Sequence, residues 1–343
     1  MKAENTTTAA ANSMRPDPVF ILGAHKSGTS LLRNLLDGHN ELFALPFESH
    51  FFQYYGYWVS NNYRYSKPVN YSTQDLIQVF TDFIQANNES DDKLGDAFVY
   101  GKLNVEAFNS VFTNLNDNHS IAEAFSLFVQ ATHQSMLEAP LPEDKLWVEK
   151  SVEHAEFALD IRKAFPKSKF VHVVRNPYSN LVSLRKYKSL GFGYPLINRV
   201  LETLENSYYH LERNQRLLDN YLLVRYEDLV SDPDRWMKEI SSFIGIEFNE
   251  SLLTPTSLGE PWAGNSTTGT KFSGVSAKNL GRWKAEIEPM EIEYVNRLFD
   301  FVMEKYDYEF VDTTSGFWKK CDGENLKRYL VNRFYKFYSA GWA

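Results

Sequence analysis

The apolar residues of the chain fall into short continuous runs separated by stretches that are typical of helices. The runs end at glycine or polar residues, as parallel strands buried on both faces do. They lie at 18–23, 145–149, 169–174 and 221–224. Helices are predicted after three of them, at 31–36, 155–165 and 178–187. The pattern predicts an α/β fold, a parallel β-sheet flanked by helices on both faces, whose ligand lies at the carboxyl ends of the strands.

Residues 50–145 interrupt this rhythm. They are rich in aromatic residues and polar loops, and Ser120 and Glu123 have the spacing of a helix capping box. We interpret them as a largely helical insertion within one domain that spans residues 18–318. The polar, alanine-rich residues 1–17 are predicted to be a disordered lead-in.

Residues 319–343 predict an amphipathic C-terminal helix. Basic residues surround an apolar face made of Leu326, Tyr329, Leu330, Phe334 and Phe337. Such a helix packs against the domain or a second subunit, which would give a homodimer, or it lies on a membrane surface. The pattern leaves these alternatives open.

Composition and charge narrow the class of protein. A chain of 343 residues with 43% hydrophobic side chains can bury a substantial core, which excludes disordered, fibrous and disulfide-held chains. Cys321 is the only cysteine, so no internal disulfide forms and a cytoplasmic location is expected. No apolar run approaches the roughly 18 residues of a transmembrane segment. The net charge of −8 argues against broad nucleic-acid binding, but residues 162–188 hold eight basic residues and no acidic one, which indicates a local cationic pocket.

A glycine-containing loop joins the first predicted strand to its helix. Residues 24–30 read Ala-His-Lys-Ser-Gly-Thr-Ser. Because such a P-loop-type turn exposes backbone N–H groups at the positive end of a helix dipole, it binds a phosphate-type anion. Gly23 and Gly28 keep the spacing of a Walker motif, but Thr29 stands where a nucleoside triphosphatase has lysine, and the loop lysine is Lys26.

The sequence Lys-Ser-Gly-Thr-Ser after a strand resembles the 5′-phosphosulfate loop of sulfotransferases, which use 3′-phosphoadenosine 5′-phosphosulfate (PAPS). Residues 170–177 look like the strand and turn of that family's 3′-phosphate site, in which a serine follows an arginine by eight residues, as Ser183 follows Arg175. Residues 224–230 and 281–284 are similar to the family's V-x-Y-E-D-L and G-x-W-K elements. The resemblance covers residues 18–310 and is closest to the carbohydrate and protein-tyrosine branch, without a membrane anchor.

The resemblance implies a set of nucleotide-binding residues. The 5′ end of PAPS would lie at Lys26, Ser27, Gly28, Thr29 and Ser30. The 3′-phosphate would bind Arg175, whose planar charged fork suits it, and Ser183, and the adenine would lie by Tyr226. Ser266 and Lys278 are further implied contacts. Leu31 stands where the cytosolic small-molecule branch often has a tryptophan that stacks on adenine.

The implied catalytic groups are two lysines and a base. Sulfuryl transfer is an in-line displacement that builds charge on the bridging and equatorial oxygens, and Lys26 and Lys150 would stabilise that charge. The transferring group carries a single negative charge, so no metal is predicted.

The residues leave more than one candidate for the general base that takes the proton of the acceptor. Val152 replaces the histidine that the small-molecule branch has two residues after its lysine. Glu48 stands about where the protein-tyrosine branch carries its catalytic glutamate, and His50 and His154 are the alternatives.

The sequence therefore predicts a PAPS-dependent sulfotransferase that acts on a hydroxyl or amine of a small glycan or secondary metabolite and releases PAP. The insertion at 50–145 would form the acceptor side. Two alternatives remain: a P-loop small-molecule kinase, which requires a Walker lysine and magnesium, and a non-catalytic nucleotide-binding regulatory domain.

Overall fold

The computed structural model describes residues 17–57, 71–88, 103–188, 197–265 and 274–312. The predictions made for residues 1–16, for Ser266 and for the C-terminal helix at 319–343 lie outside these residues.

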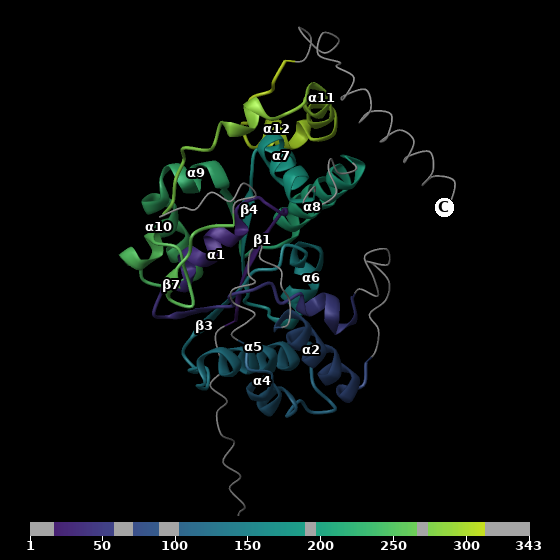
Figure 1. The fold of residues 1–343 in the computed structure, drawn as a ribbon, viewed down its shortest axis with the longest axis vertical. Helices are drawn as coiled ribbons and strands as arrows, with labels where there is room; N and C mark the ends of the chain where they lie inside the picture. Colours follow the sequence, from purple (N-terminus) through teal and green to yellow (C-terminus); the bar gives the residue numbers. More distant parts are fainter. Residues whose placement is uncertain (1–16, 58–70, 89–102, 189–196, 266–273, 313–343) are drawn as a thin grey trace, which may run out of the picture.

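A parallel five-stranded sheet lies at the centre of the described chain (Figure 1). Its strands are β1 (Val19–Gly23), β2 (Leu42–Ala44), β3 (Leu146–Glu149), β4 (Lys169–Val174) and β5 (Tyr221–Arg225). The strand order is β2-β3-β1-β4-β5, and every neighbouring pair is parallel. The predicted α/β fold class is confirmed, and with it the four strands that the apolar runs indicated.

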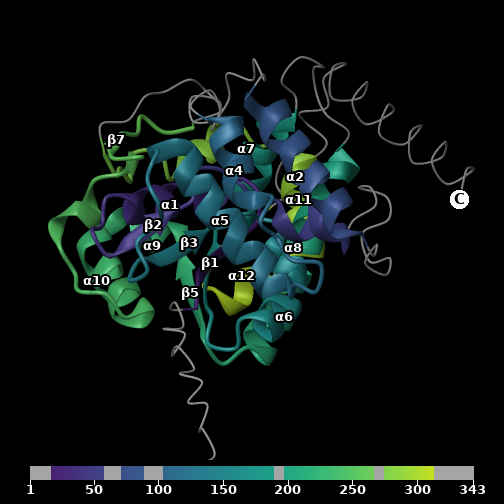
Figure 2. The same cartoon turned by 90° about the horizontal axis from the view of Figure 1, so that it is seen from below.

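Helices and short turns surround the sheet. Around the strands lie α1 (Thr29–Asp37), α6 (His154–Ala164), α7 (Pro177–Lys188), α8 (Ile197–Leu217), α9 (Tyr226–Ser231), α10 (Pro233–Ile244), α11 (Pro289–Leu298) and α12 (Asp300–Lys305). The shorter elements are η2 (Glu250–Leu253), η3 (Arg282–Ala285) and the antiparallel pair β6 (Thr256–Ser257) and β7 (Glu260–Pro261). Figures 1 and 2 show α1 and α10 on one side of the strands and α6 and α8 on the other.

The side chains of β1 explain why the strand runs are apolar throughout. Phe20 and Leu22 are buried in a cluster with side chains of α6, whereas Val19 and Ile21 are buried with side chains of α1 and α10. Successive side chains of a strand point to opposite faces, so a strand covered on both faces needs apolar residues at every position.

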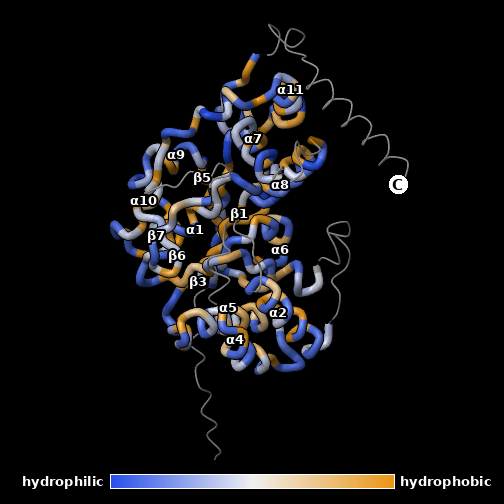
Figure 3. The backbone as a smooth tube through the Cα atoms, in the orientation of Figure 1, coloured by the Kyte–Doolittle hydropathy of each residue, from blue (hydrophilic) through white to orange (hydrophobic). Residues whose placement is uncertain are grey.

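The described part of residues 50–145 is helical. It contains η1 (Gln53–Tyr57), α2 (Thr73–Asn88), α4 (Val105–Phe112) and α5 (Ile121–Leu137). The capping box at Ser120 and Glu123 is present, with both reciprocal hydrogen bonds. Several aromatic rings of this region are core residues, because Phe51 packs 4.8 Å from both Phe80 and Phe125 between ring centres. Figure 3 shows hydrophobic stretches in α4 and α5.

The apolar pattern does not predict β2. This strand has only three residues, and it pairs with β3 so that Leu42 lies opposite Leu146. A run this short cannot be told from a loop by its pattern, but the strand positions the residues that follow it, including Glu48 and His50.

No helix in the described ranges is long and apolar enough to cross a membrane.

Candidate active site

The loop between β1 and α1 has a left-handed backbone at two positions. Lys26 has a φ of 63°, and Gly28, the N-cap of α1, has a φ of 106°. A Cβ at Gly28 would lie 2.3 Å from Cδ2 of Tyr226, so glycine is required for the Tyr226 ring to pack against the loop. Because glycine has no side chain to cap α1, the first N–H groups of the helix are available to an anion in the loop.

Arg175 lies directly beside this loop. Its Nη1 donates a hydrogen bond to the Lys26 carbonyl at 2.8 Å, and its guanidinium carbon lies 4.5 Å from the ring centre of Tyr226. Asn180 Nδ2 adds a hydrogen bond to the His25 carbonyl at 2.7 Å. Arg175 follows β4 and Tyr226 follows β5, so the carboxyl ends of three adjacent strands bring these residues together.

Among the loop residues, Arg175 and Asn180, three buried polar atoms have no hydrogen-bond partner in the part of the chain that the structure describes: Arg175 Nε, Ser27 Oγ and Asn180 Oδ1. Buried polar groups are almost always paired. Two of the three belong to donor groups, which fits an anion bound at this loop.

The Lys26 side chain contacts two segments that are distant in the sequence. Its Nζ donates a hydrogen bond to the Asn265 carbonyl at 3.1 Å and lies 5.1 Å from the ring centre of Tyr187. Asn265 Nδ2 also donates a hydrogen bond to Ser30 Oγ at 3.3 Å. Asn265 directly precedes Ser266, so the family resemblance indicated the segment but not this residue.

Two further predicted nucleotide contacts, Ser183 and Lys278, lie on segments outside the loop. Ser183 is partly exposed on α7, eight residues after Arg175. Lys278 is exposed in the loop before η3, where its backbone N–H donates to Ser276 Oγ at 3.3 Å. None of the contacts described for Lys278 joins it to Arg175 or to the loop, in the part of the chain that the structure describes.

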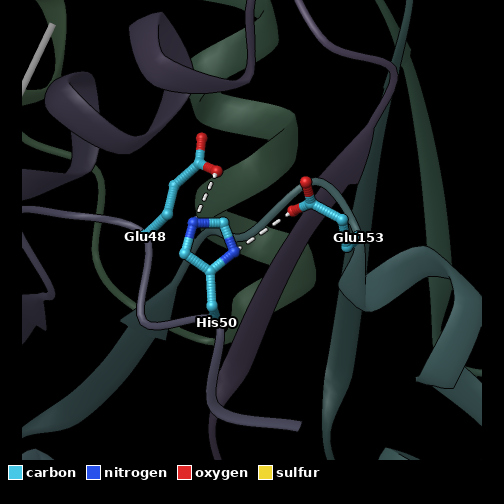
Figure 4. Close-up of side chains that lie close together, drawn as sticks. All are labelled: Glu48, His50 and Glu153. Carbon is cyan, nitrogen blue, oxygen red and sulfur yellow. Dashed lines mark ion pairs between the residues drawn. The ribbon is translucent and has the colours of Figure 1, made fainter. Parts of the chain in front are cut away.

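A second group of side chains, here called the acid–base cluster, consists of Glu48, His50, Lys150 and Glu153. It lies after β2 and β3, which are neighbours in the sheet. Lys150 forms an ion pair with Glu48, and their side chains are 2% and 20% exposed. His50 lies between two carboxylates, with Nε2 3.7 Å from Glu48 Oε2 and Nδ1 3.4 Å from Glu153 Oε2 (Figure 4).

The buried carboxylate of Glu149 fixes the two loops that carry the acid–base cluster. It accepts hydrogen bonds from Ser49 Oγ at 2.7 Å and Ser151 Oγ at 2.6 Å, and its other oxygen lies 2.6 Å from His154 Nδ1. Burial alone would raise the pKa of Glu149, but the His154 imidazole and the two hydroxyl donors outweigh it and lower that pKa. His154 has no exposed surface, so it is part of this support.

The charges around His50 keep its imidazole protonated near neutral pH. Burial alone would lower the pKa of His50, but the hydrogen bond to Glu153 and the charges of Glu153, Glu48 and Glu149 raise it to about 9. In turn, His25 and His50 overcome the effect of burial on Glu153 and hold its pKa well below the usual value.

One further contact joins the loop to the acid–base cluster. His25 Nε2 lies 3.1 Å from Glu153 Oε1, and His25 is the residue before Lys26. The phosphate-type loop, Arg175 and the acid–base cluster therefore belong to one continuous site. Sequence reasoning missed Glu153, because its role depends on contacts with segments about a hundred residues earlier in the chain.

Comparisons with known proteins identify the family of the chain. The model of the sulfotransferase family matches residues 18–250. The omega-hydroxy-beta-dihydromenaquinone-9 sulfotransferase of Mycobacterium bovis is 30% identical over 102 residues, which are 26% of this chain and 26% of that protein. Human carbohydrate sulfotransferase 2 is 30% identical over 135 residues, which are 37% of this chain and 24% of that protein. The chain thus spans about a quarter of the length of these curated relatives.

A solved structure has the same fold. The sulfotransferase domain from the curacin biosynthetic pathway is 21% identical, with a TM-score of 0.54 over 86% of this chain and 99% of that domain. The family match covers well over half of the sequence and includes β1 to β5 with the loop and Arg175. The protein therefore belongs to the sulfotransferase family.

Proposed function

We propose that the protein transfers a sulfuryl group from PAPS to a hydroxyl or amine of a small acceptor and releases PAP. The observation that carries this proposal is the direct contact between Arg175 and the backbone of the loop. A nucleotide with phosphate groups on both its 5′ and 3′ sides needs two anion sites close together, and these two segments offer them. The unpartnered Nε of Arg175 supports a bound phosphate on that side.

The residues around these two sites fit an adenosine nucleotide. The backbone N–H groups of residues 28–30 at the helix N-terminus and the unpartnered Oγ of Ser27 would bind the 5′-phosphosulfate. Ser183 on α7 would add a neutral donor to the 3′-phosphate that Arg175 binds, and Tyr226 would lie by the adenine. Ser266 and Lys278 remain proposed contacts on the strength of the family resemblance alone.

The proposed reaction is an in-line displacement. The acceptor oxygen or nitrogen forms a bond to sulfur while the bond from sulfur to the bridging oxygen breaks, and the electron pair leaves on the phosphate of PAP. Lys26 and Lys150 would stabilise the charge that develops on the sulfuryl and bridging oxygens. The acceptor proton would pass to Glu48.

Glu48 is the base that the surroundings favour. His154 is fully buried against Glu149 and cannot meet an acceptor. His50 has its pKa raised to about 9, so it already holds its proton at neutral pH and cannot take another. Glu48 keeps some exposure and sits beside the lysine that would bind the sulfuryl group.

The acceptor is proposed to be a small glycan or a secondary metabolite. The relatives named above act on carbohydrate and on a hydroxylated menaquinone, and both offer a hydroxyl to the sulfuryl group. The helices of residues 50–145 would form the acceptor side, since Glu48 and His50 lead directly into them. The cytoplasmic location and the homodimer stay predictions.

A comparison of nucleotides tests the proposal without an acceptor. A ligand that binds only the folded state raises its melting temperature, so PAP is expected to stabilise the protein more than AMP, ADP or ATP does. A preference for ATP that depends on magnesium would support the kinase alternative. Tight PAP binding without any sulfuryl transfer to a panel of glycan and metabolite acceptors would support the regulatory alternative.

Metal dependence needs a separate control. Glu48, His50 and Glu153 present ligand atoms within 4.8 Å of one another, a spacing that would also suit a divalent cation. The proposed reaction does not use one, so turnover is expected to survive a chelator. Loss of turnover that only a divalent cation restores would overturn the proposed role of Glu48.

A further inference from the structure

Glu153 contacts two imidazoles that come from different parts of the site. Its Oε1 lies 3.1 Å from Nε2 of His25, in the loop that would bind the sulfuryl donor. Its Oε2 lies 3.4 Å from Nδ1 of His50, which follows Glu48 by two residues. The Glu153 side chain is only 13% exposed. One carboxylate thus joins the donor loop to the segment that carries the proposed base.

The backbone of His50 is held in a conformation that few residues adopt. Its φ is 46°, in the left-handed region. Its N–H donates a hydrogen bond to Ser151 Oγ at 3.1 Å. A non-glycine residue in this region costs energy and persists only where its surroundings over-determine it, often at functional sites. The backbone at His50 is therefore held by its surroundings, and it places the imidazole between Glu48 and Glu153.

His50 supplies Glu48 with a second partner. Lys150 pairs with Glu48 Oε1 in this structure, but in the proposed reaction Lys150 is also needed at the sulfuryl oxygens. When Lys150 turns to the sulfuryl group, His50 Nε2, 3.7 Å from the other oxygen of Glu48, is left to orient the carboxylate. A carboxylate held in one orientation accepts the acceptor proton with less reorganisation.

Building on the proposed sulfuryl transfer, we propose that Glu153 is a positioning residue that couples the donor loop, through His25, to the general base, through His50. Occupation of the loop by the donor and orientation of Glu48 are then set together. The coupling is reciprocal, since a change at one imidazole must be felt at the other through their shared carboxylate.

The charges around His50 support this coupling. His50 faces Glu48 and Glu153 directly, with Glu149 and Lys150 close behind, and the carboxylates keep it protonated. His25 and Glu153 also line a cavity of about 20 Å³ between α6 and α8, which has room for one water molecule.

Histidine NMR of the full chain tests the coupling without an acceptor. In the wild type, His50 is expected to titrate near pH 9, and saturating PAP is expected to shift the imidazole signals of both His25 and His50. In Glu153→Gln, the His50 pKa is expected to fall by about one pH unit or more, because a neutral amide replaces the carboxylate. PAP should then no longer shift the His50 signal, although it still binds.

Glu156→Gln is the matched control. Glu156 lies one turn further along α6, lines the same cavity and accepts a hydrogen bond from Asn206 at 2.7 Å, so the same change there should leave both His50 readouts as in the wild type. An unchanged His50 pKa in Glu153→Gln, or a His50 response to PAP that survives the substitution, overturns the proposal.

His25→Gln covers the case in which Glu153→Gln does not fold. His25 is 32% exposed, and its loss should abolish the response of His50 to PAP while the His50 pKa stays high. A response that persists in this variant also overturns the coupling. If the wild type binds no PAP, the proposed function fails instead, and the His50 pKa in the Glu153 variant still tests the contact between these two residues.

Discussion

The two halves of the site consist of different kinds of chemical group. The proposed donor half, at the ends of β1, β4 and β5, consists of Arg175 and of the backbone N–H groups of a glycine-containing loop and a helix N-terminus, which do not titrate. The acid–base half, at the ends of β2 and β3, consists of ionisable side chains that hold one another by ion pairs. Binding of the donor should therefore change little with pH near neutrality, whereas proton transfer should change a great deal.

The largest expected effects are losses of turnover, one from a substitution in each half. Lys26→Ala and Glu48→Gln are each expected to lower turnover on the order of a hundredfold or more, since a charge stabiliser or a base is worth about that much. Steady-state kinetics with radiolabelled or mass-resolved sulfuryl transfer measures the loss. Glu48→Gln should leave the PAP dissociation constant nearly unchanged, because Glu48 belongs to the acid–base half.

A near-normal rate in Glu48→Gln would reject Glu48 as the base. His50→Gln, made in parallel, tests whether His50 is the base instead. If it is, turnover in His50→Gln is lower than in Glu48→Gln. A loss of PAP affinity in Glu48→Gln would measure how strongly the coupling through Glu153 joins the two halves.

Arg175 gives the next largest effect, on binding rather than on turnover. Arg175→Ala is expected to weaken PAP binding roughly ten- to a hundredfold, the worth of charge-assisted hydrogen bonds to a phosphate. Titration calorimetry with AMP, which lacks the 3′-phosphate, should show a much smaller loss. Arg175→Lys keeps the charge but not the planar fork over Tyr226, so an intermediate affinity is expected. Equal losses for PAP and AMP would place Arg175 elsewhere than at the 3′-phosphate.

The donor half could be predicted from the sequence because its chemistry is local. The loop follows directly from β1, and Arg175 follows directly from β4, so a strand pattern and a short motif suffice to locate both. Adjacent parallel strands then place the two segments side by side. The segment before Ser266 was also indicated, although the residue whose carbonyl meets Lys26 is Asn265.

The acid–base half could be predicted only in part. Glu48 and Lys150 were indicated by family resemblance, but β2, which positions Glu48, is too short to leave a recognisable pattern. The ion pairs of Glu153 with His25 and His50 join segments about a hundred residues apart, and a hydrophobic pattern along the sequence cannot predict such a contact. Lys278 is implied by the family resemblance alone, and its contact with the nucleotide stays a prediction for an exposed side chain.

The pH dependence of stability sharpens the comparison. A raised pKa means that His50 contributes stability fully below its ordinary pKa of 6.5, and that this contribution is lost as the pH rises through about 9. The wild type should therefore melt above His50→Gln at pH 6, and the difference in melting temperature should narrow between pH 7 and 9.5. PAP affinity over pH 6.5 to 8 is expected to stay nearly constant. A difference in melting temperature that does not narrow would show that His50 carries no charge in the folded protein.

The smallest expected effect falls on Ser183. Unlike Arg175, it offers only a neutral hydroxyl, and one such hydrogen bond is worth roughly a two- to tenfold change in affinity. Ser183→Ala should therefore weaken PAP binding by a few-fold and leave AMP binding unchanged, which calorimetry can resolve. Because Ser183 is partly exposed on α7, its removal should not alter the melting temperature without ligand. If PAP and AMP weaken together, Ser183 does not meet the 3′-phosphate, and Arg175 must hold that group with partners from another segment.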